Sequence, residues 1–202
     1  KAIKELKTKN FLTYGFSKKA NYVIQKVKYN FTNTNFQLKV KSFGSKKEII
    51  KNIDLNLIGK HNVLNATAAI VVCLNLGIKA NIIKKALKNF SGVQRRLTKI
   101  FQKNKVDFYD DYAHHPTEIK SVLEGIKKVS SKRKIIAVFQ PHRYSRIKSL
   151  KSEFSSCFKS SDLVILCPVY AAGEAVDQGY NNRRFAQLIL KFSKTQVILI
   201  EN

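Results

Sequence analysis

From residue 97 onward, the sequence alternates short apolar runs with amphipathic helical patterns. Such an alternation makes neighbouring strands parallel, because each helix carries the chain back to the starting end of the sheet. This part of the chain is therefore predicted to be an α/β domain with a mostly parallel sheet. Strands are predicted at 97–101, 106–110, 134–139, 162–167 and 195–200, and helices at 117–129, 147–159 and 181–192.

Residues 10–58 have a different pattern, which is typical of antiparallel β structure. Segments 22–29 and 35–40 alternate roughly with period two on either side of Thr32–Thr34. A hairpin is predicted there, because short polar residues between two such runs favour a turn. Further strands are predicted at 11–16 and 53–57.

Two helices are predicted after these strands. The first opens near Gly59, and almost every residue from Ala66 to Leu76 is apolar, so burial on most sides is expected. The second, over 79–90, is amphipathic. The 202 residues suffice for one large or two small domains. We place the boundary near Arg96, which gives domains 1–96 and 97–202.

Composition narrows the class of protein. At 44% hydrophobic the chain can bury a core, and no apolar run is long enough to span a bilayer. Its three widely spaced cysteines suggest neither a disulfide framework nor a zinc site, and they fit a reducing, cytoplasmic compartment. The segment Lys1–Glu5 has no initiator methionine and no signal-peptide pattern, so we expect a piece of a longer chain.

The formal net charge of +25 would, taken alone, suggest a nucleic acid or another anionic partner. The lysines are spread along the whole chain, however, and abundant Lys, Ile and Asn are what an AT-rich coding sequence produces. No zinc-finger spacing, RGG run or aromatic RNA-binding motif is present. We expect no nucleic-acid partner, while a polyphosphate substrate would suit the charge.

The segment Asp110–Glu118 carries the densest polar chemistry of the chain, with two carboxylates, a phenol and two imidazoles within six residues. It lies between a predicted strand and a predicted helix. Ligands of open α/β sheets bind at the carboxyl ends of strands, so a ligand site is predicted here. The alternative is a capped turn with two surface histidines.

Two further polar loops follow predicted strands and would lie at the same edge of the sheet. Segment Phe139–Arg146 contains His142, Arg143 and Arg146, and its two arginines could clamp a carboxylate. Segment Val169–Glu174 follows the next predicted strand. Each loop alone could be an ordinary solvated connection, but three at one edge favour a ligand site.

Asn62 and Asn65 are three residues apart at the start of a predicted helix, so their amides would lie on one face. An amide offers a donor and an acceptor together, which matches the N6/N7 edge of adenine. Helix capping is the alternative. Arg95 and Arg96 lie at the predicted domain boundary, where their guanidinium groups suit phosphate oxygens or form a solvated hinge.

In this order, the polar blocks resemble the Mur ligases, the ATP-dependent amino-acid ligases of peptidoglycan synthesis. The resemblance covers nearly the whole chain from Thr13–Phe16 onward. It implies that residues 1–96 are the C-terminal half of a central ATP-binding domain of mixed β structure and helices. Residues 97–202 would be a Rossmann-like C-terminal amino-acid-ligase domain, incomplete at its end. The blocks are Gly59–Ala66, Gly92–Arg96, Asp110–Glu118, Phe139–Arg146 and Val169–Glu174.

The resemblance also implies a reaction. The blocks match the family members that join L-alanine to UDP-N-acetylmuramate, with MgATP activating the muramate carboxylate as an acyl phosphate. This activity would serve peptidoglycan synthesis, and with it cell-wall biogenesis, cell shape and cell division. Ligases that attach recycled murein tripeptide share the His-Asn block and the Asp-Asp-Tyr-Ala-His-His-Pro block, the latter with Tyr or Phe at its third position. They are the alternative, but they are not expected to carry Phe139–Arg146.

Roles for the nucleotide-binding residues follow from the resemblance. Asn62 and Asn65 would hold the adenine, with His61 in the same block. Asp111 would bind the ribose, and Arg96 would bind the phosphates.

The resemblance assigns the remaining candidates to the acceptor side. His115, Arg143 and Arg146 would orient the alanine and the muramoyl carboxylate, with His142 and Tyr112 in the same pocket. The catalytic candidates are Arg96, Asp111 and His115.

Several family features are missing from the sequence. These are the Gly-rich phosphate loop with its Lys and Thr, the Glu and His that hold magnesium, and the UDP-binding N-terminal domain. No metal ligand is therefore assigned, and Mg²⁺ is expected to bind upstream. We expect that the chain does not catalyse alone. A non-catalytic nucleotide- or nucleic-acid-binding module is the remaining alternative.

Overall fold

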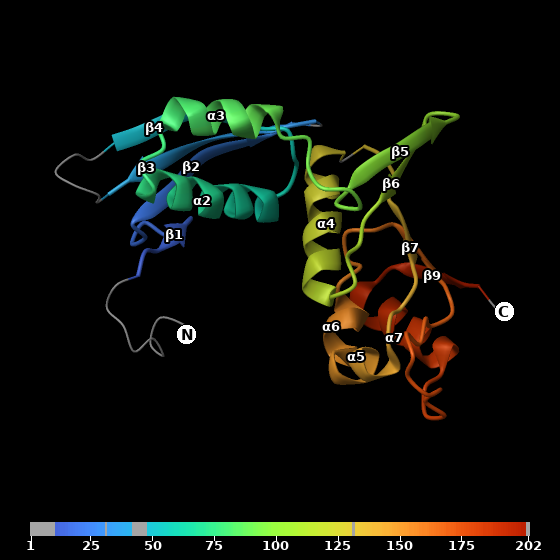
Figure 1. Ribbon diagram of the computed structural model, residues 1–202. Coiled ribbons are helices and arrows are strands. Elements are labelled where there is room, and N and C mark those ends of the chain that lie inside the picture. The colour runs from blue at the N-terminus through green and yellow to red at the C-terminus, as the bar shows by residue number, and fades with distance from the viewer. Residues whose placement is uncertain (1–10, 31, 42–47, 131, 201–202) are drawn as a thin grey trace. The chain divides into compact units, whose positions relative to one another are not determined.

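The computed structural model describes residues 11–30, 32–41, 48–130 and 132–200. The chain forms two compact units, Lys1–Ser91 and Gly92–Asn202 (Figure 1). Each unit has its own hydrophobic core. Within the described ranges, no helix combines the length and the apolar character needed to cross a bilayer.

The first unit contains a four-stranded sheet in the order β1-β2-β3-β4. Strands β2 and β3 are antiparallel, as are β3 and β4, so the predicted hairpin is confirmed. The strand expected over 11–16 is shorter and pairs with β2 in parallel. The strands are β1 (Tyr14–Gly15), β2 (Tyr22–Tyr29), β3 (Thr34–Val40) and β4 (Glu48–Leu55).

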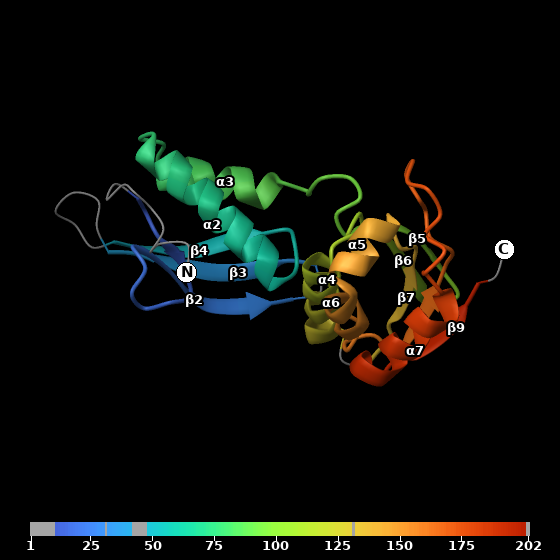
Figure 2. The ribbon, with the colours of Figure 1, turned by 90° about the horizontal axis from the view of Figure 1, so that it is seen from below.

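Two helices, α2 (Lys60–Asn75) and α3 (Ala80–Asn89), lie on one side of this sheet (Figure 2). Alternate residues of β3 face them, which is why Phe36 and Leu38 are fully buried. The expectation that the first helix is buried on most sides is wrong. Its far side remains open in this unit, with Val72 59% exposed.

The second unit contains the predicted parallel sheet, with three strands in the order β7-β8-β9. Helices run between these strands, and the helix expected over 147–159 is divided at Leu150 into two short ones. Phe154, Phe158 and Ile189 are completely buried between helices and sheet. The elements are β7 (Ile136–Phe139), β8 (Leu163–Leu166), β9 (Gln196–Leu199), α4 (Pro116–Val129), α5 (Tyr144–Ser149), α6 (Lys151–Ser156) and α7 (Asn182–Ser193).

The strands expected at 97–101 and 106–110 do not join that sheet. They form a separate antiparallel pair, β5 (Thr98–Lys103) and β6 (Val106–Asp110). The connection is only two residues long, and Asn104 and Lys105 have φ values of 49° and 64°. Positive φ at both positions is the geometry that joins adjacent antiparallel strands, so the turn decides the pairing.

Asp107 ties this hairpin to the body of the second unit. Its carboxylate lies 2.6 Å from Lys99 Nζ and accepts a hydrogen bond from Arg133, which lies just before β7. The Arg133 side chain also donates to the carbonyl of Lys105 at 2.7 Å. Hydrogen bonds from Lys99 and Arg133 hold the pKa of Asp107 below its ordinary value.

Replacing Asp107 with Asn should lower the urea midpoint of unfolding at pH 7, because two cations lose their shared carboxylate. A carboxyl group with a depressed pKa stabilises the fold above its ordinary pKa, and this contribution disappears as pH falls through the folded-state value. The difference between wild type and variant should therefore shrink below about pH 4. Asp177→Asn, at an exposed turn, is the control and should show no such convergence.

Candidate functional site

The carboxylate of Asp111 holds two segments of the second unit together. Its Oδ1 accepts from the backbone N–H of Ala113, and its Oδ2 accepts from that of Leu97, both at 2.7 Å. Tyr112 N–H donates to the carbonyl of Arg95 at 2.8 Å. The boundary segment, Arg95–Leu97, is thus joined to the loop after β6 by two hydrogen bonds, one to Asp111 and one from Tyr112. Each Asp111 oxygen keeps one lone pair, which leaves room for a ligand hydroxyl.

The boundary segment adopts a strained backbone. Arg95 and Leu97 have φ values of 58° and 51°, in the left-handed region that non-glycine residues seldom occupy. Such conformations persist where surrounding contacts determine them, and here the Asp111 carboxylate supplies one such contact.

His115 begins α4 as its N-cap. The N–H of Thr117 donates to His115 Nδ1 at 3.3 Å, so the hydrogen bonding assigns the ring proton to Nε2. Pro116 occupies the first helical position, where its missing N–H costs nothing. The capped-turn interpretation thus describes the backbone correctly, while the Nε2 side of the ring remains available to a ligand.

Rings from three loops form a row in the second unit. Ring centres lie 5.0 Å apart for Tyr112 and His114, 6.3 Å for His114 and His142, and 5.2 Å for His142 and Tyr170. The guanidinium carbon of Arg95 lies 4.8 Å from the Tyr112 ring centre. The structure therefore brings the loops after β6, β7 and β8 together, although β6 belongs to a different sheet.

Backbone hydrogen bonds fix the second and third of these loops to each other. Arg143 N–H donates to the carbonyl of Tyr170, and Tyr170 N–H donates to that of Pro141, both at 2.9 Å. Glu174 accepts from the hydroxyl of Ser145 at 2.5 Å and from its N–H at 3.1 Å. These bonds from Ser145 hold the pKa of Glu174 below its usual value. The start of α5, which carries the arginines, is thereby held in place.

Two polar atoms in this region are buried without a partner. Among the described residues, nothing bonds to His142 Nδ1 or to Arg146 Nη1. Burial lowers the pKa of His142, and the charges of Arg146 and Arg143 lower it further, so the ring is neutral at pH 7. An unpaired buried polar group costs about 1–3 kcal/mol, which an anionic ligand on the guanidinium would recover.

Residues His61, Asn62 and Asn65 form a separate group in the first unit, at the start of α2. The N-cap is Gly59, and no side chain caps this helix, so the capping alternative for the asparagines is wrong. The Asn62 amide donates to the carbonyl of Ile58 at 2.8 Å and keeps its oxygen available. Asn65 is exposed.

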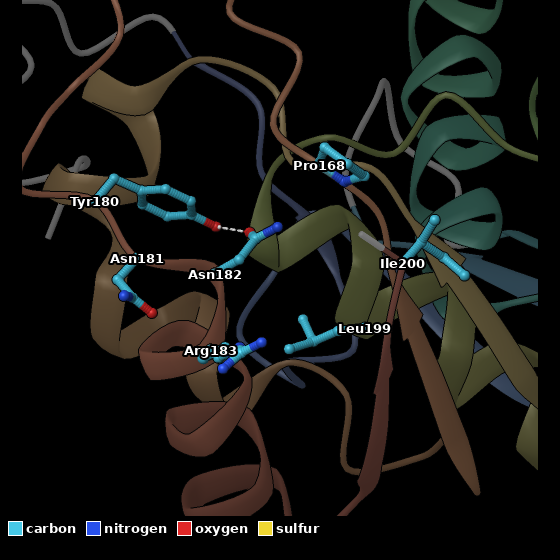
Figure 3. Close-up of a pocket in the computed structure, with 7 residues that line it drawn as sticks. All are labelled: Pro168, Tyr180, Asn181, Asn182, Arg183, Leu199 and Ile200. Carbon is cyan, nitrogen blue, oxygen red and sulfur yellow. Dashed lines mark hydrogen bonds between the residues drawn. The ribbon is translucent and has the colours of Figure 1, made fainter. Parts of the chain in front are cut away.

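A shallow pocket of about 340 Å³ lies beyond the ends of β8 and β9, and none of the predicted site residues lines it (Figure 3). The Tyr180 hydroxyl points at Asn182 and donates to its side-chain oxygen at 2.7 Å. The sequence signal for this pocket was its place after two parallel strands, β8 and β9. It was not recognised because Asn181 and the residues after it have the pattern of an ordinary helix start. The lining residues are Pro168, Tyr180, Asn181, Asn182, Arg183, Leu199 and Ile200.

Sequence reasoning also missed three residues that contact the predicted site. His114 and Tyr170 belong to the row of rings, and Glu118 lies beside the candidates Arg96 and His115. The paired histidines were a signal for His114. In the described part of the chain, no group of three or more His, Cys, Asp or Glu residues is placed to hold a metal ion.

Family models match both parts of the chain. The Mur ligase, glutamate ligase domain matches residues 95–202, and the Mur ligase middle domain matches residues 1–73. The chain belongs to the Mur ligase family.

Within this family, the relatives and solved structures most similar to the chain include UDP-N-acetylmuramate–L-alanine ligases. A UDP-N-acetylmuramate–L-alanine ligase of Pelagibacter ubique is 47% identical over 99% of this chain, which covers 43% of that protein. The crystal structure of the UDP-N-acetylmuramate–alanine ligase of Thermotoga maritima matches with a TM-score of 0.73 and 27% identity, over 95% of this chain and 39% of that one. The crystal structure of a murein peptide ligase of Psychrobacter arcticus matches with a TM-score of 0.58 and 20% identity, over 94% of this chain and 38% of that one. At this identity the match shows the fold alone. The chain thus spans about two fifths of these proteins.

Gly59→Ala should destabilise the first unit by about 1–3 kcal/mol, because φ is 99° and an added Cβ would lie 2.8 Å from His61 Cε1. Gly77→Ala is the matched control, since φ is 81° but nothing lies within 4 Å of the added carbon. Urea unfolding should show the larger loss for Gly59→Ala. Equal losses would mean that the His61 ring does not pack against Gly59.

Proposed function

We propose that this chain is part of an ATP-dependent ligase that joins L-alanine to UDP-N-acetylmuramate in peptidoglycan synthesis. The 47% identical relative bears the name of that activity. The observation that carries the site is the pair of buried, unpartnered atoms, His142 Nδ1 and Arg146 Nη1, where three polar loops meet. A guanidinium in this state needs an anion, and a substrate carboxylate is one.

Two parts of the chain would have different tasks. Residues 1–96 would supply the C-terminal half of the central ATP-binding domain, and residues 97–202 would form most of the amino-acid-ligase domain. The change from an antiparallel to a parallel sheet supports this division. We place the reaction in the cytoplasm, and the three free cysteines fit that compartment.

On the nucleotide side, the amides of Asn62 and Asn65 would bind the adenine, together with His61. The remaining lone pairs of Asp111 would accept a ribose hydroxyl. Arg96 would bind the phosphates, and its side chain is 54% exposed, so it can reach a ligand. ATP supplies the phosphoryl group that turns the muramate carboxylate into a reactive acyl donor, and Mg²⁺ is expected to bind outside this chain.

On the acceptor side, Arg143 and Arg146 would hold carboxylate groups, with Tyr112 and neutral His142 beside them. His115, with Nε2 as its free nitrogen, would orient the alanine for attack on the acyl carbon. The chain's own residues therefore contribute positioning and charge neutralisation, which are the main protein contributions to phosphoryl and acyl transfer.

The activity can be tested in a complete ligase that carries this segment. Phosphate release should depend on ATP, UDP-N-acetylmuramate and L-alanine together, and the 202-residue chain alone should release none. A requirement for murein tripeptide in place of alanine would favour the recycling ligase. Salt-dependent affinity for DNA tighter than that for ATP would favour a nucleic-acid-binding module.

Two variants of the complete ligase should separate the two sides of the site. Asp111→Ala should raise the KM for ATP, and Arg146→Ala should raise the KM for alanine or UDP-N-acetylmuramate. Each rise should be about tenfold to hundredfold, for the loss of one charge-assisted contact. Arg184→Ala, at an exposed position of α7, is the control and should change neither constant. Loss of ATP affinity alone in both variants would remove the arginines from the acceptor site.

A further inference from the structure

Glu118, in the first turn of α4, contacts both sides of the proposed site. Its Oε2 accepts from the backbone N–H of His114 at 3.1 Å and of His115 at 3.3 Å. Its Oε1 lies 3.8 Å from Arg96 Nη1. One carboxylate thus contacts both the turn that carries His115, assigned to the acceptor side, and the guanidinium of Arg96, assigned to the phosphates.

The two oxygens of Glu118 have separate tasks. Oε2 fixes the backbone of the His114–His115 turn, which is a constraint of geometry. Oε1 faces Arg96, whose long side chain would otherwise sample many rotamers, and this is a constraint of charge. Burial alone would raise the pKa of Glu118, but the two N–H groups and the charges of His114 and Arg96 outweigh it and hold the pKa low. The group is therefore ionised at neutral pH.

We propose that Glu118 is a positioning residue of the ligase site, which sets the His114–His115 turn through Oε2 and holds Arg96 ready for phosphate through Oε1. In this role it acts through these residues and not by contact with any of the three substrates. The inference rests on the proposed function for its kinetic consequences. Its structural part, the fixing of the turn, does not depend on that function.

Two substitutions in a complete ligase separate the two tasks. Glu118→Gln keeps a carbonyl oxygen that can accept both N–H groups but removes the charge, so the KM for ATP should rise about two- to fivefold, as for an exposed ion pair. Its kcat should stay within about twofold. Glu118→Ala removes both contacts, and kcat should fall at least about tenfold, because displacing a positioned group by about 1 Å can cost a hundredfold.

Glu124 offers a matched control on the same helix. It is exposed and forms an ion pair at 3.9 Å with Lys120, four residues earlier. Glu118 has the same spacing to His114, whose Nδ1 lies 3.8 Å from Glu118 Oε2. Glu124→Gln and Glu124→Ala should leave kcat and KM unchanged. If the Glu124 variants changed kcat and KM as much as the Glu118 variants, the loss of any carboxylate on α4 would have the same kinetic effect. The proposal would then be overturned.

A second readout keeps the proposal separate from the proposed function. Hydrogen–deuterium exchange of the peptide that contains His114 and His115 should be faster in Glu118→Ala, while Glu118→Gln should match wild type. If the wild-type enzyme showed no ligase activity, the proposed function would fail, and exchange would still decide the fixing of the turn. Equal kcat losses in Gln and Ala variants, or equal exchange in all three proteins, would overturn the positioning role.

Discussion

The site of the second unit depends on a carboxylate that bonds to backbone rather than to another side chain. Asp111 accepts from Leu97 N–H and Ala113 N–H, which fixes the boundary segment against the loop after β6. The next part of the loop follows directly from this contact, because His115 starts α4 four residues later and Tyr112 begins the row of rings. Replacing such an acceptor would leave two partly buried N–H groups without a partner, one of them on Leu97, whose φ is 51°.

The strands and helices could be predicted to the extent that local pattern determines them. Segment 22–29 was predicted as a strand from its rough alternation, and β2 has the predicted bounds. Its burial is less regular than the pattern suggested, because Tyr22, Val23 and Ile24 are all buried and the register shifts between Gln25 and Lys28. The pattern of 106–110 likewise predicted a strand, but not its partner. Pairing was decided by the two positive φ values at Asn104 and Lys105, in a turn without glycine. Helix α2 is almost entirely apolar from Ala66 to Leu74, so the sequence of this part alone could not show which side is covered.

The predicted site residues came from a rule of topology, and the same rule explains what was missed. Loops at the carboxyl ends of strands were expected to meet, and the rings of His114 and His142 lie 6.3 Å apart. Glu118 was not predicted because it lies inside a helix, where an acid near the N-terminus has an ordinary explanation in the helix dipole. Its contact with Arg96 joins residues 22 positions apart and exists only in the folded chain.

Charge composition and charge position give different information about this molecule. With 38 basic and 13 acidic residues, the net charge suggests a polyanion-binding surface. Several acids of the second unit, however, accept hydrogen bonds from backbone N–H groups. Asp162 receives the N–H of Ile135 at 2.7 Å, Glu174 receives that of Ser145, and Glu118 receives two. A lysine on a solvated surface can be replaced or repositioned with little effect on stability. Removing the acceptor of a backbone N–H that is shielded from water leaves that N–H unsatisfied and is costly. Asp111, Glu118 and Glu174 therefore mark the site through the N–H groups that they accept, and the many lysines do not.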